Sequence, residues 1–335
     1  MEFGKNKILI TFLLVVLIMA CLIPAVWLSF SSRGQNGIKM LADNITASNK
    51  PTPFQPFMQT TTPTRDIQPI TNALVPIEGL IPPEGQVSIL VFGSDFRPDS
   101  GFRTDVVLLI SIFTKEAKVK MVSFPRDLLV QVPGQNEERI NTVMQSGGFD
   151  LAKATFAYNF AVPVNLYMMT NFNGFKAIID TLGGIDIETP TNTADRCDLS
   201  YQHGAWCSIG PGNAHLDGEL ALWYVRSRYT SSDFDRIRRA QEVLIATFKK
   251  VMSLGGLSKA PELYNQFINS VETNISLQDI LPILSIAPAV YNEPARITRH
   301  SIGLEQASPS NSDAYLLEPD YIKVWQVIKE TVYIP

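Results

Sequence analysis

The sequence predicts an α/β fold, namely a three-layer αβα domain with a mixed central sheet, preceded by one transmembrane helix. Three observations lead to this prediction. A charge-free apolar run lies near the N-terminus, a Pro- and Thr-rich stretch follows it, and beyond residue 86 short apolar runs alternate with segments of helical periodicity. With 335 residues, 45% of them hydrophobic, the chain can bury a sizeable core. Its net charge of -4 argues against a protein that coats nucleic acid, and its three cysteines are too few for a disulfide scaffold.

The apolar run over residues 8–30 predicts a membrane-spanning helix. No charged residue lies between Lys7 and Arg33. As a helix the run would reach about 34 Å, which exceeds the ~30 Å hydrocarbon core of a bilayer. The alternatives are a cleaved signal peptide or a lipoprotein site at Cys21. The length of the run, its continuation beyond Cys21 and the lack of a small-x-small site after it favour an uncleaved anchor.

Residues 31–85 predict an extended stalk between the membrane and the folded domain. The stretch is rich in Pro, Thr, Gln and Asn and shows no amphipathic periodicity. A flexible chain of this length has a root-mean-square reach of about 40 Å. The globular domain is therefore predicted to span residues 86–335.

The orientation of the anchor rests on two weaker features. Positive charges lie on both sides of the run, so the short tail over 1–7 makes a cytoplasmic N-terminus the default expectation. In CDLSYQHGAWC, nine residues separate Cys197 from Cys207. A disulfide between them would indicate an oxidising compartment, whereas two free cysteines are the alternative. Both features favour a single-pass protein of the cell membrane with an extracytoplasmic domain.

Strands and helices are predicted throughout the globular part. The apolar runs predict strands over 87–92, 105–113, 119–124 and 185–188, with the second and third joined as a hairpin by the charged turn over 114–118. Helical spacing predicts helices over 149–160, 172–182, 219–225, 234–251 and 319–332. Gly183 and Gly184 are expected to end the second helix, and Asp217 to cap the third.

Arginine is concentrated in five short segments at predicted strand ends and loops. The segments are GSDFR (93–97), GFRTD (101–105), SFPRD (123–127), RIN (139–141) and YVRSRYTSSDFDRIRRAQ (224–241). They contain no lysine but nine arginines: Arg97, Arg103, Arg126, Arg139, Arg226, Arg228, Arg236, Arg238 and Arg239. Because the guanidinium plane binds phosphate bidentately, this clustering favours a site for a multiply charged anion such as pyrophosphate. The alternative is that each arginine pairs with a nearby surface aspartate.

Two aspartates lie where neighbouring strands would meet. Asp95 follows the first predicted strand and Asp105 begins the second. Together they could hold a hard cation such as Mg²⁺, which takes one or two carboxylates and fills its other positions with phosphate oxygens and water. The alternative for Asp95 is that it only caps a turn.

The spacing of the last arginines restricts their geometry. Arg226 and Arg228 would point about 200° apart on one helix, so both face a ligand only if the helix ends near Arg226. Arg236 and Arg239 are three residues apart and share a helix face.

These segments, in this order, resemble the LytR-CpsA-Psr family of bacterial cell-envelope proteins. The matching stretches are GSDFR, GFRTDVVLLIS, VSFPRDL, RIN, NFNGFKAIIDTLGGIDI, LDGELALWYVRSR and DFDRIRRAQ. The resemblance implies a membrane-anchored phosphotransferase that moves a glycopolymer from a polyprenyl-pyrophosphate carrier to peptidoglycan through a phosphodiester link. A polyprenyl-pyrophosphate-linked glycan, a peptidoglycan acceptor and the membrane are the implied partners, and no nucleic acid is.

The resemblance also implies roles for individual residues. Asp95 and Asp105 look like the carboxylates that hold Mg²⁺ or Mn²⁺, and Arg126 looks like the arginine essential for transfer, accompanied by Asp127. Arg103, Arg126, Arg226, Arg228 and Arg236 look like the family's pyrophosphate-binding arginines, and the arginine clustering extends the predicted pyrophosphate-binding set to Arg97, Arg139 and Arg239. Either Asp105 or Asp127 would act as the base. The chain departs from the pattern at Ala240, where the family has glutamine, and at Arg139, where lysine is common. The CDLSYQHGAWC stretch falls outside the pattern and receives no predicted role.

Two other functions fit the same residues. The site could hydrolyse a polyprenyl pyrophosphate, with water in place of a sugar hydroxyl. A non-enzymatic protein that binds or senses envelope lipids is the third possibility. The acceptor of the phosphoryl group distinguishes the first two, and any turnover excludes the third.

Overall fold

A computed structural model of the chain describes residues 81–95, 101–229, 233–253, 270–276, 279, 282–283, 285–311 and 313–335. The predicted membrane helix, nearly all of the predicted stalk and Arg97 lie outside these residues. Within the described part of the chain, no helix is both long and apolar enough to cross a bilayer.

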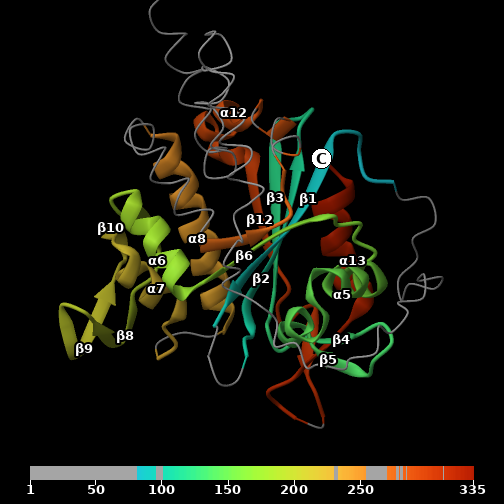
Figure 1. Ribbon diagram of the computed structural model, residues 1–335, viewed down its shortest axis with the longest axis horizontal. Helices are drawn as coiled ribbons and strands as arrows, with labels where there is room; N and C mark the ends of the chain where they lie inside the picture. The colour runs from blue at the N-terminus through green and yellow to red at the C-terminus, as the bar shows by residue number, and fades with distance from the viewer. Residues whose placement is uncertain are drawn as a thin grey trace, which may run out of the picture.

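The described residues form a mixed α/β fold (Figure 1). The strands are β1 Gln86–Ser94, β2 Thr104–Phe113, β3 Lys118–Phe124, β4 Leu129–Gln131, β5 Glu137–Arg139, β6 Leu166–Asn171, β7 Ile185–Thr189, β8 Thr193–Leu199, β9 Gln202–Ile209, β10 Gly212–Leu216, β11 Val271–Thr273, β12 Ile297–Ser301, β13 Ala307–Pro309 and β14 Leu317–Pro319. The α-helices are α5 Val143–Phe160, α6 Phe172–Thr181, α7 Gly218–Arg226, α8 Asp233–Met252, α12 Ala287–Asn292 and α13 Tyr321–Ile328.

A six-stranded mixed sheet in the order β11-β6-β1-β2-β3-β12 is the centre of the fold. β1 runs antiparallel to β2 and parallel to β6, and β12 runs parallel to β3. β2 and β3 form the predicted antiparallel hairpin around the turn over 114–117. The prediction of a mixed central sheet is therefore confirmed.

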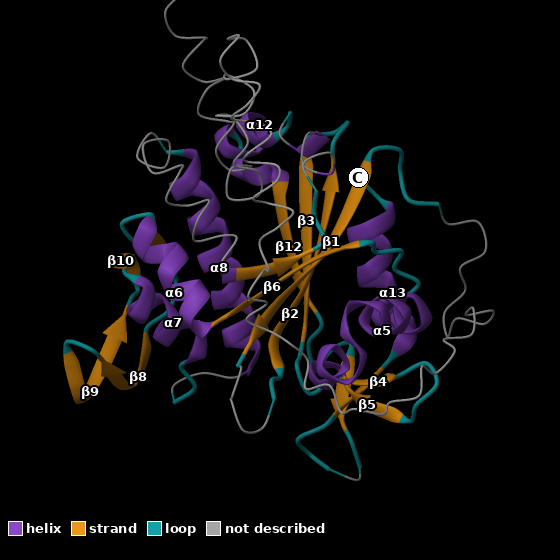
Figure 2. Cartoon of the chain, viewed as in Figure 1, coloured by secondary structure: helices purple, strands orange, loops and turns teal. Residues whose placement is uncertain are grey.

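Side chains along β1 alternate between two hydrophobic clusters, as the period of two in a strand requires. Leu90 and Phe92 join the cluster that includes side chains of α5 and α13. Ile89 and Val91 join the cluster that includes α8 and α12. Helices thus cover both faces of the sheet (Figure 2), and β1 is buried on each side as its continuous apolar run predicts.

A third cluster lies beside the sheet and supports the two-stranded pairs β7–β10 and β8–β9. It contains Ile179 of α6, Trp223 and Tyr224 of α7, and Val243 of α8. The sulfur atoms of Cys197 and Cys207 also lie in it, 2.10 Å apart in a disulfide, with their Cα atoms 5.6 Å apart. The stretch without a predicted role is therefore a cross-linked β-hairpin packed on α7.

The ends of the helices follow local signals in the sequence. Gly183 and Gly184 have φ values of 74° and 84°, which suit glycine, and their N–H groups bond carbonyls of the last turn of α6. The carboxylate of Asp217 accepts the N–H of Leu220 and caps α7. Helix α5 begins before its predicted start, with a break at Gly147 and Gly148. Beyond α13 the chain continues as a π-helical segment, Lys329–Tyr333.

One buried amide connects three elements around the first cluster. Asn159 of α5 is fully buried. Its side chain accepts the N–H of Gln131 at 2.9 Å and donates to the carbonyl of the same residue at 2.7 Å. The amide thus satisfies both backbone polar groups of the last residue of β4. Tyr321 of α13 donates its hydroxyl to Asn159 Oδ1 at 2.9 Å. Burial raises the pKa of Tyr321 to about 12, so the hydroxyl remains a donor at neutral pH.

We predict that Asn159→Ala lowers the free energy of unfolding by roughly 2–4 kcal/mol, because it leaves several buried polar groups without partners. Tyr321→Phe removes only the hydroxyl contact and should cost about 1 kcal/mol. Urea unfolding of both variants measures the difference. Equal destabilisation of the two variants would contradict the role assigned to the amide.

Candidate functional site

The carboxyl end of β1 brings the two predicted cation ligands to one edge of the sheet. Gly93 pairs with Val106 while Ser94 pairs with Thr104, so Asp105 is the extra residue of a β-bulge. A bulge re-aims the extra side chain, which is why such irregularities recur beside functional sites. Asp95 follows Ser94 and continues the ladder through its N–H, which bonds the carbonyl of Arg103 at 3.0 Å.

Asp95 is also bound by its side chain. Its Oδ1 accepts the backbone N–H of Arg103 at 2.7 Å, and the residue is buried. Arg103 itself is exposed. The pair therefore fixes the backbone on either side of the segment over 96–102 and leaves Arg103 at the surface next to Asp95.

Arg126 bridges two carboxylates. Its Nη1 donates to Asp105 Oδ1 at 3.0 Å and its Nε donates to Asp127 Oδ2 at 3.0 Å. All three side chains are partly buried, with exposed fractions of 22% for Arg126, 26% for Asp105 and 14% for Asp127. A guanidinium held at two of its edges has a fixed plane, as bidentate recognition of an anion requires.

The loop that carries Arg126 is held by contacts with later segments. The N–H of Asn141 bonds the carbonyl of Arg126, and the N–H of Leu317 bonds the carbonyl of Asp127. Arg139 extends the charge network, because its Nη1 lies 3.4 Å from Asp127 Oδ1. The buried Oδ1 of Asn141 has no hydrogen-bond partner within the described part of the chain. The RIN segment is predicted to contribute Arg139, and no sequence pattern singled out the amide of Asn141.

Asp95 and Asp105 fit the chemistry of a Mg²⁺ or Mn²⁺ site. Both offer carboxylate oxygens, the hard donors that these ions prefer. Among the described residues, no group of three or more His, Cys, Asp or Glu side chains could hold a metal ion by itself. A cation bound here would therefore need phosphate oxygens or water to complete its shell, as Mg²⁺ sites in phosphoryl-transfer enzymes commonly do.

Arg226 reaches the same edge of the sheet from α7. Ser94 also pairs with Asn171 of the parallel strand β6, so Phe172 begins α6 beside the end of β1. The guanidinium of Arg226 lies 4.4 Å from the ring centroid of Phe172. The helix ends at Arg226, as the spacing of Arg226 and Arg228 requires. The pairing register of β1 with β6 thus brings the arginine segment at the end of α7 to the same edge of the sheet as the segments around Asp95 and Asp105.

The turn after α7 is held by Asp195, which no sequence pattern singled out. Asp195 Oδ2 accepts the backbone N–H groups of Arg228 at 2.6 Å and Tyr229 at 3.0 Å, and the hydroxyl of Ser227 at 3.0 Å. Burial alone would raise the pKa of Asp195, but these bonds outweigh it and the pKa lies below the usual value. The carboxylate stays charged at neutral pH and fixes where Arg228 leaves the helix.

The prediction that Arg239 contacts pyrophosphate is corrected by its burial. The side chain is 0% exposed. Its Nη2 donates to the carbonyl of Ser227, its Nη1 donates to Thr193 Oγ1 at 3.3 Å, and its guanidinium lies 5.6 Å from the ring centroid of Tyr224. Arg239 therefore positions the turn between Arg226 and Arg228 and does not face a ligand.

The neighbours of Arg239 on α8 have different surroundings. Arg236 is partly buried, and Arg238 pairs with Glu242 at 2.5 Å. Gln241 is buried and donates to Ser123 Oγ and to the carbonyl of His300, both at 2.9 Å. It ties α8 to β3 and β12. The departure at Ala240 leaves this contact of Gln241 intact.

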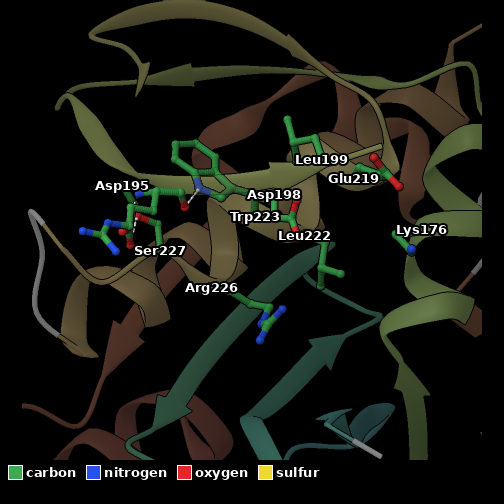
Figure 3. A pocket seen from close by; sticks show the side chains of 10 residues that line it. Lys176, Asp195, Asp198, Leu199, Glu219, Leu222, Trp223, Arg226 and Ser227 are labelled. Atoms are coloured by element: carbon green, nitrogen blue, oxygen red, sulfur yellow. Dashed lines mark hydrogen bonds between the residues drawn. The ribbon is translucent and has the colours of Figure 1, made fainter. Parts of the chain in front are cut away.

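A pocket of about 310 Å³ adjoins the late arginine segment (Figure 3). Strand β8 and α7 form most of its wall, with Lys176 contributed by α6. Its lining residues are Lys176, Asp195, Arg196, Asp198, Leu199, Glu219, Leu222, Trp223, Arg226 and Ser227. Arg226 therefore belongs both to this pocket and to the edge that carries Asp95 and Asp105.

Relatives with established names are similar to this chain in sequence. The chain is 33% identical to the polyisoprenyl-teichoic acid–peptidoglycan teichoic acid transferase TagU of Bacillus mycoides over 193 residues, which are 57% of this chain and 60% of TagU. It is 28% identical to the transferase TagV of Bacillus subtilis over 72% of this chain and 63% of TagV. The matches thus span less than two thirds of either relative.

Solved structures of related proteins are also similar to this chain. The crystal structure of Bacillus subtilis TagV superimposes with a TM-score of 0.61 at 28% identity, covering 75% of this chain and 98% of that chain. A structure of TagT bound to LI-WTA superimposes with a TM-score of 0.55 at 25% identity, covering 78% and 94%. The family model LytR_cpsA_psr matches residues 58–330, from within the predicted stalk to the π-helical segment after α13. The chain belongs to the LytR_cpsA_psr family.

Proposed function

We propose that this protein is a phosphotransferase that moves a glycopolymer from a polyprenyl-pyrophosphate carrier to peptidoglycan and links the two by a phosphodiester. The supporting observation is the edge of the sheet at which Arg126 bridges Asp105 and Asp127 while Arg226 approaches beside Asp95. The names of TagU and TagV, teichoic acid transferases acting on peptidoglycan, agree with it.

In this proposal a sugar hydroxyl of the acceptor attacks the phosphorus that carries the glycopolymer. A new O–P bond forms, the bond from that phosphorus to the bridging oxygen breaks, and polyprenyl phosphate leaves with the bonding electrons. The hydroxyl proton passes to a base. Phosphoryl transfer of this kind depends on positioning and on neutralising charge over the phosphoryl oxygens. Arg103, Arg126, Arg139, Arg226, Arg228 and Arg236 would supply that charge.

Asp105 is better placed than Asp127 to take the proton. Both oxygens of Asp127 face an arginine, since Oδ2 accepts Arg126 Nε and Oδ1 lies 3.4 Å from Arg139. Asp105 is more exposed, and its Oδ1 accepts Arg126. A carboxylate has about four acceptor positions, so Asp105 has capacity both for one contact with a cation and for the proton. Asp127 then acts as a positioning residue for Arg126.

A cation would be held by Asp95 and Asp105. When bound, Mg²⁺ or Mn²⁺ would neutralise part of the charge on the pyrophosphate oxygens. Arg126 keeps the carboxylate of Asp105 in place through the 3.0 Å contact of its Nη1, independently of the ion.

The location of the protein is part of the proposal. A helix over residues 8–30 would anchor it in the cell membrane, with the tail over 1–7 in the cytoplasm and the α/β domain outside. The disulfide of Cys197 and Cys207 agrees with an oxidising compartment. A lipid-linked donor and a cell-wall acceptor would both be within reach of a domain placed there.

We predict that Arg126→Ala lowers the transfer rate about 10²- to 10³-fold, because it removes a fixed donor from the developing charge and leaves two carboxylates without their shared partner. The measurement uses the full chain in detergent with a polyprenyl-pyrophosphate-linked glycan, Mg²⁺ and peptidoglycan, and quantifies wall-bound glycan. Arg299→Ala, at an exposed arginine of β12, is the matched control and should transfer at the wild-type rate. Release of free glycan phosphate by the wild type, without wall-bound product, would instead identify a hydrolase.

We also predict that transfer depends on a divalent cation held by Asp105. Chelation should abolish activity, and Mg²⁺ or Mn²⁺ should restore it. Asp105→Asn should raise the cation concentration for half-maximal activity at least about tenfold, since an amide is a much weaker ligand for a hard cation. It should also lower the rate at saturating cation, because it removes the proposed base. Asp186→Asn, at an exposed carboxylate beside Lys250, is the control. Full activity of the wild type after chelation would refute the cation assignment.

A further inference from the structure

The disulfide hairpin β8–β9 packs on α7 but takes no direct part in the proposed transfer reaction. Its strand β8 lines one side of the 310 Å³ pocket, and Arg226 and Lys176 lie on the other (Figure 3). This volume is at the lower end of the range for small-molecule sites, ~300–1,000 Å³, and suits a ligand unit about the size of one ring. The pocket is therefore large enough to hold part of a substrate beside Arg226.

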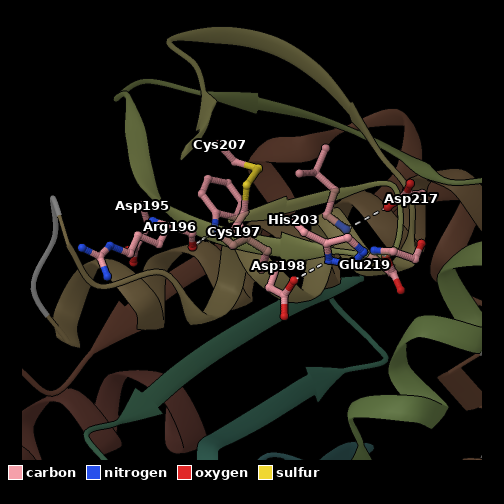
Figure 4. Close-up of a disulfide and its surroundings, with 11 residues drawn as sticks. Asp195, Arg196, Cys197, Asp198, His203, Cys207, Asp217 and Glu219 are labelled. Carbon is pink, nitrogen blue, oxygen red and sulfur yellow. Dashed lines mark hydrogen bonds and ion pairs between the residues drawn. A yellow bond between two sulfur atoms is a disulfide. The ribbon is translucent and has the colours of Figure 1, made fainter. Parts of the chain in front are cut away.

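The hairpin is fixed to α7 at several points (Figure 4). Trp223 Nε1 donates to the carbonyl of Arg196 at 3.0 Å, and Glu219 accepts the N–H of Ser200 at 2.7 Å. Asp195 binds the turn after α7, and the disulfide joins the two strands. These contacts hold the wall of the pocket in one geometry before any ligand arrives, which lowers the entropic cost of binding.

The charges that line the pocket balance. Lys176, Arg196 and Arg226 provide three positive groups, and Asp195, Asp198 and Glu219 provide three negative ones, of which the carboxylate of Asp195 already binds the turn after α7. The N–H of Ser200 holds the pKa of Glu219 below its usual value, so this carboxylate is charged at neutral pH. Such a lining offers donors and acceptors side by side and has no net preference for an anion. Neutral hydroxyl groups, which both donate and accept, match it better than phosphate does.

Two exposed aromatic residues are bound through their backbones to residues that line the pocket, since Trp206 is paired with Arg196 and the N–H of Tyr229 bonds Asp195. Trp206 is paired with Arg196 across the hairpin and is 50% exposed, and Tyr229 is 70% exposed. Their ring centroids are 4.6 Å apart in an edge-to-face contact. Rings of this kind present rigid amphipathic surfaces that favour binding at low entropic cost, and the apolar C–H faces of sugar rings can pack on them.

We propose that the hairpin β8–β9, the pocket beneath it and the pair of Trp206 and Tyr229 form a saccharide subsite, which binds a hydroxyl-bearing sugar of a glycan chain beside the arginine site. The inference rests on the proposed function, because a glycan must lie next to the pyrophosphate for transfer to occur. Arg226 connects the two sites, since it lines the pocket and contacts Phe172 at the end of β6. Either the peptidoglycan acceptor or the donor glycopolymer offers the required chemistry.

The test measures binding by the full chain in detergent with three separate probes. These are soluble uncrosslinked peptidoglycan strands, lipid-free glycopolymer, and polyprenyl pyrophosphate without a glycan. Trp206→Ala removes one ring and Asp198→Asn removes a pocket carboxylate while it preserves its shape. Each variant should weaken glycan binding roughly 5- to 30-fold. Tyr315→Ala, at a tyrosine that is 83% exposed and is not among the pocket residues, should bind as the wild type does.

The three probes separate the outcomes. Weaker binding of peptidoglycan strands alone assigns the subsite to the acceptor, and weaker binding of glycopolymer alone assigns it to the donor. The inference is overturned if both variants bind both glycans as the wild type does, if the wild type binds neither, or if polyprenyl pyrophosphate binding falls equally. A wild type that binds a glycan but transfers none would refute the proposed function and leave the saccharide subsite standing.

Discussion

Ser94, the last residue of β1, is paired with Thr104 of β2 on one side and with Asn171 of β6 on the other. This double pairing fixes the positions of Asp95, Asp105 and Phe172 at once. β2 is antiparallel and β6 is parallel to β1, so the carboxyl ends of β1 and β6 and the amino end of β2 meet at this edge. Open α/β sheets bind ligands outside the carboxyl ends of their strands for the same reason. A shift of one residue in this register would turn the site residues to the opposite faces of the sheet.

The carboxylates at this edge determine what Arg126 can do. Two partly buried aspartates hold its guanidinium plane, and each contact is 3.0 Å long. The same aspartates offset much of its charge, so attraction for pyrophosphate depends on other groups of the site as well as on Arg126. The exposed Arg103, Arg226 and Arg228 are suited to that role. In this division of tasks Arg126 presents a fixed donor to the phosphoryl oxygens, while the other arginines and a cation supply the excess positive charge.

Much of this arrangement was predictable from the sequence. The apolar run before Asp95 identified β1, the glycines at 183 and 184 identified the end of α6, and the spacing of Arg226 and Arg228 required the helix to end where it does. These signals are local, because each depends on the conformation of a few neighbouring residues. The bulge at Asp105 and the contact of Arg226 with Phe172 depend on the register between strands that are distant in the chain. No periodicity within a single segment contains that information.

Arg239 shows most clearly where a residue pattern stops being informative. In the sequence it is indistinguishable from the arginines that face the site, since it shares their segment and their residue type. Burying a guanidinium is costly unless its donors find acceptors, and here they meet a carbonyl, a hydroxyl and the face of Tyr224. The carbonyl belongs to Ser227, whose hydroxyl and following N–H groups are bound by Asp195. Arg239, a buried cation, thus binds the carbonyl of this turn, and Asp195, a partly buried anion, binds its hydroxyl and N–H groups. Arg226 and Arg228 can diverge from a common point because both contacts hold this turn, which makes the buried arginine a condition for the exposed ones to act.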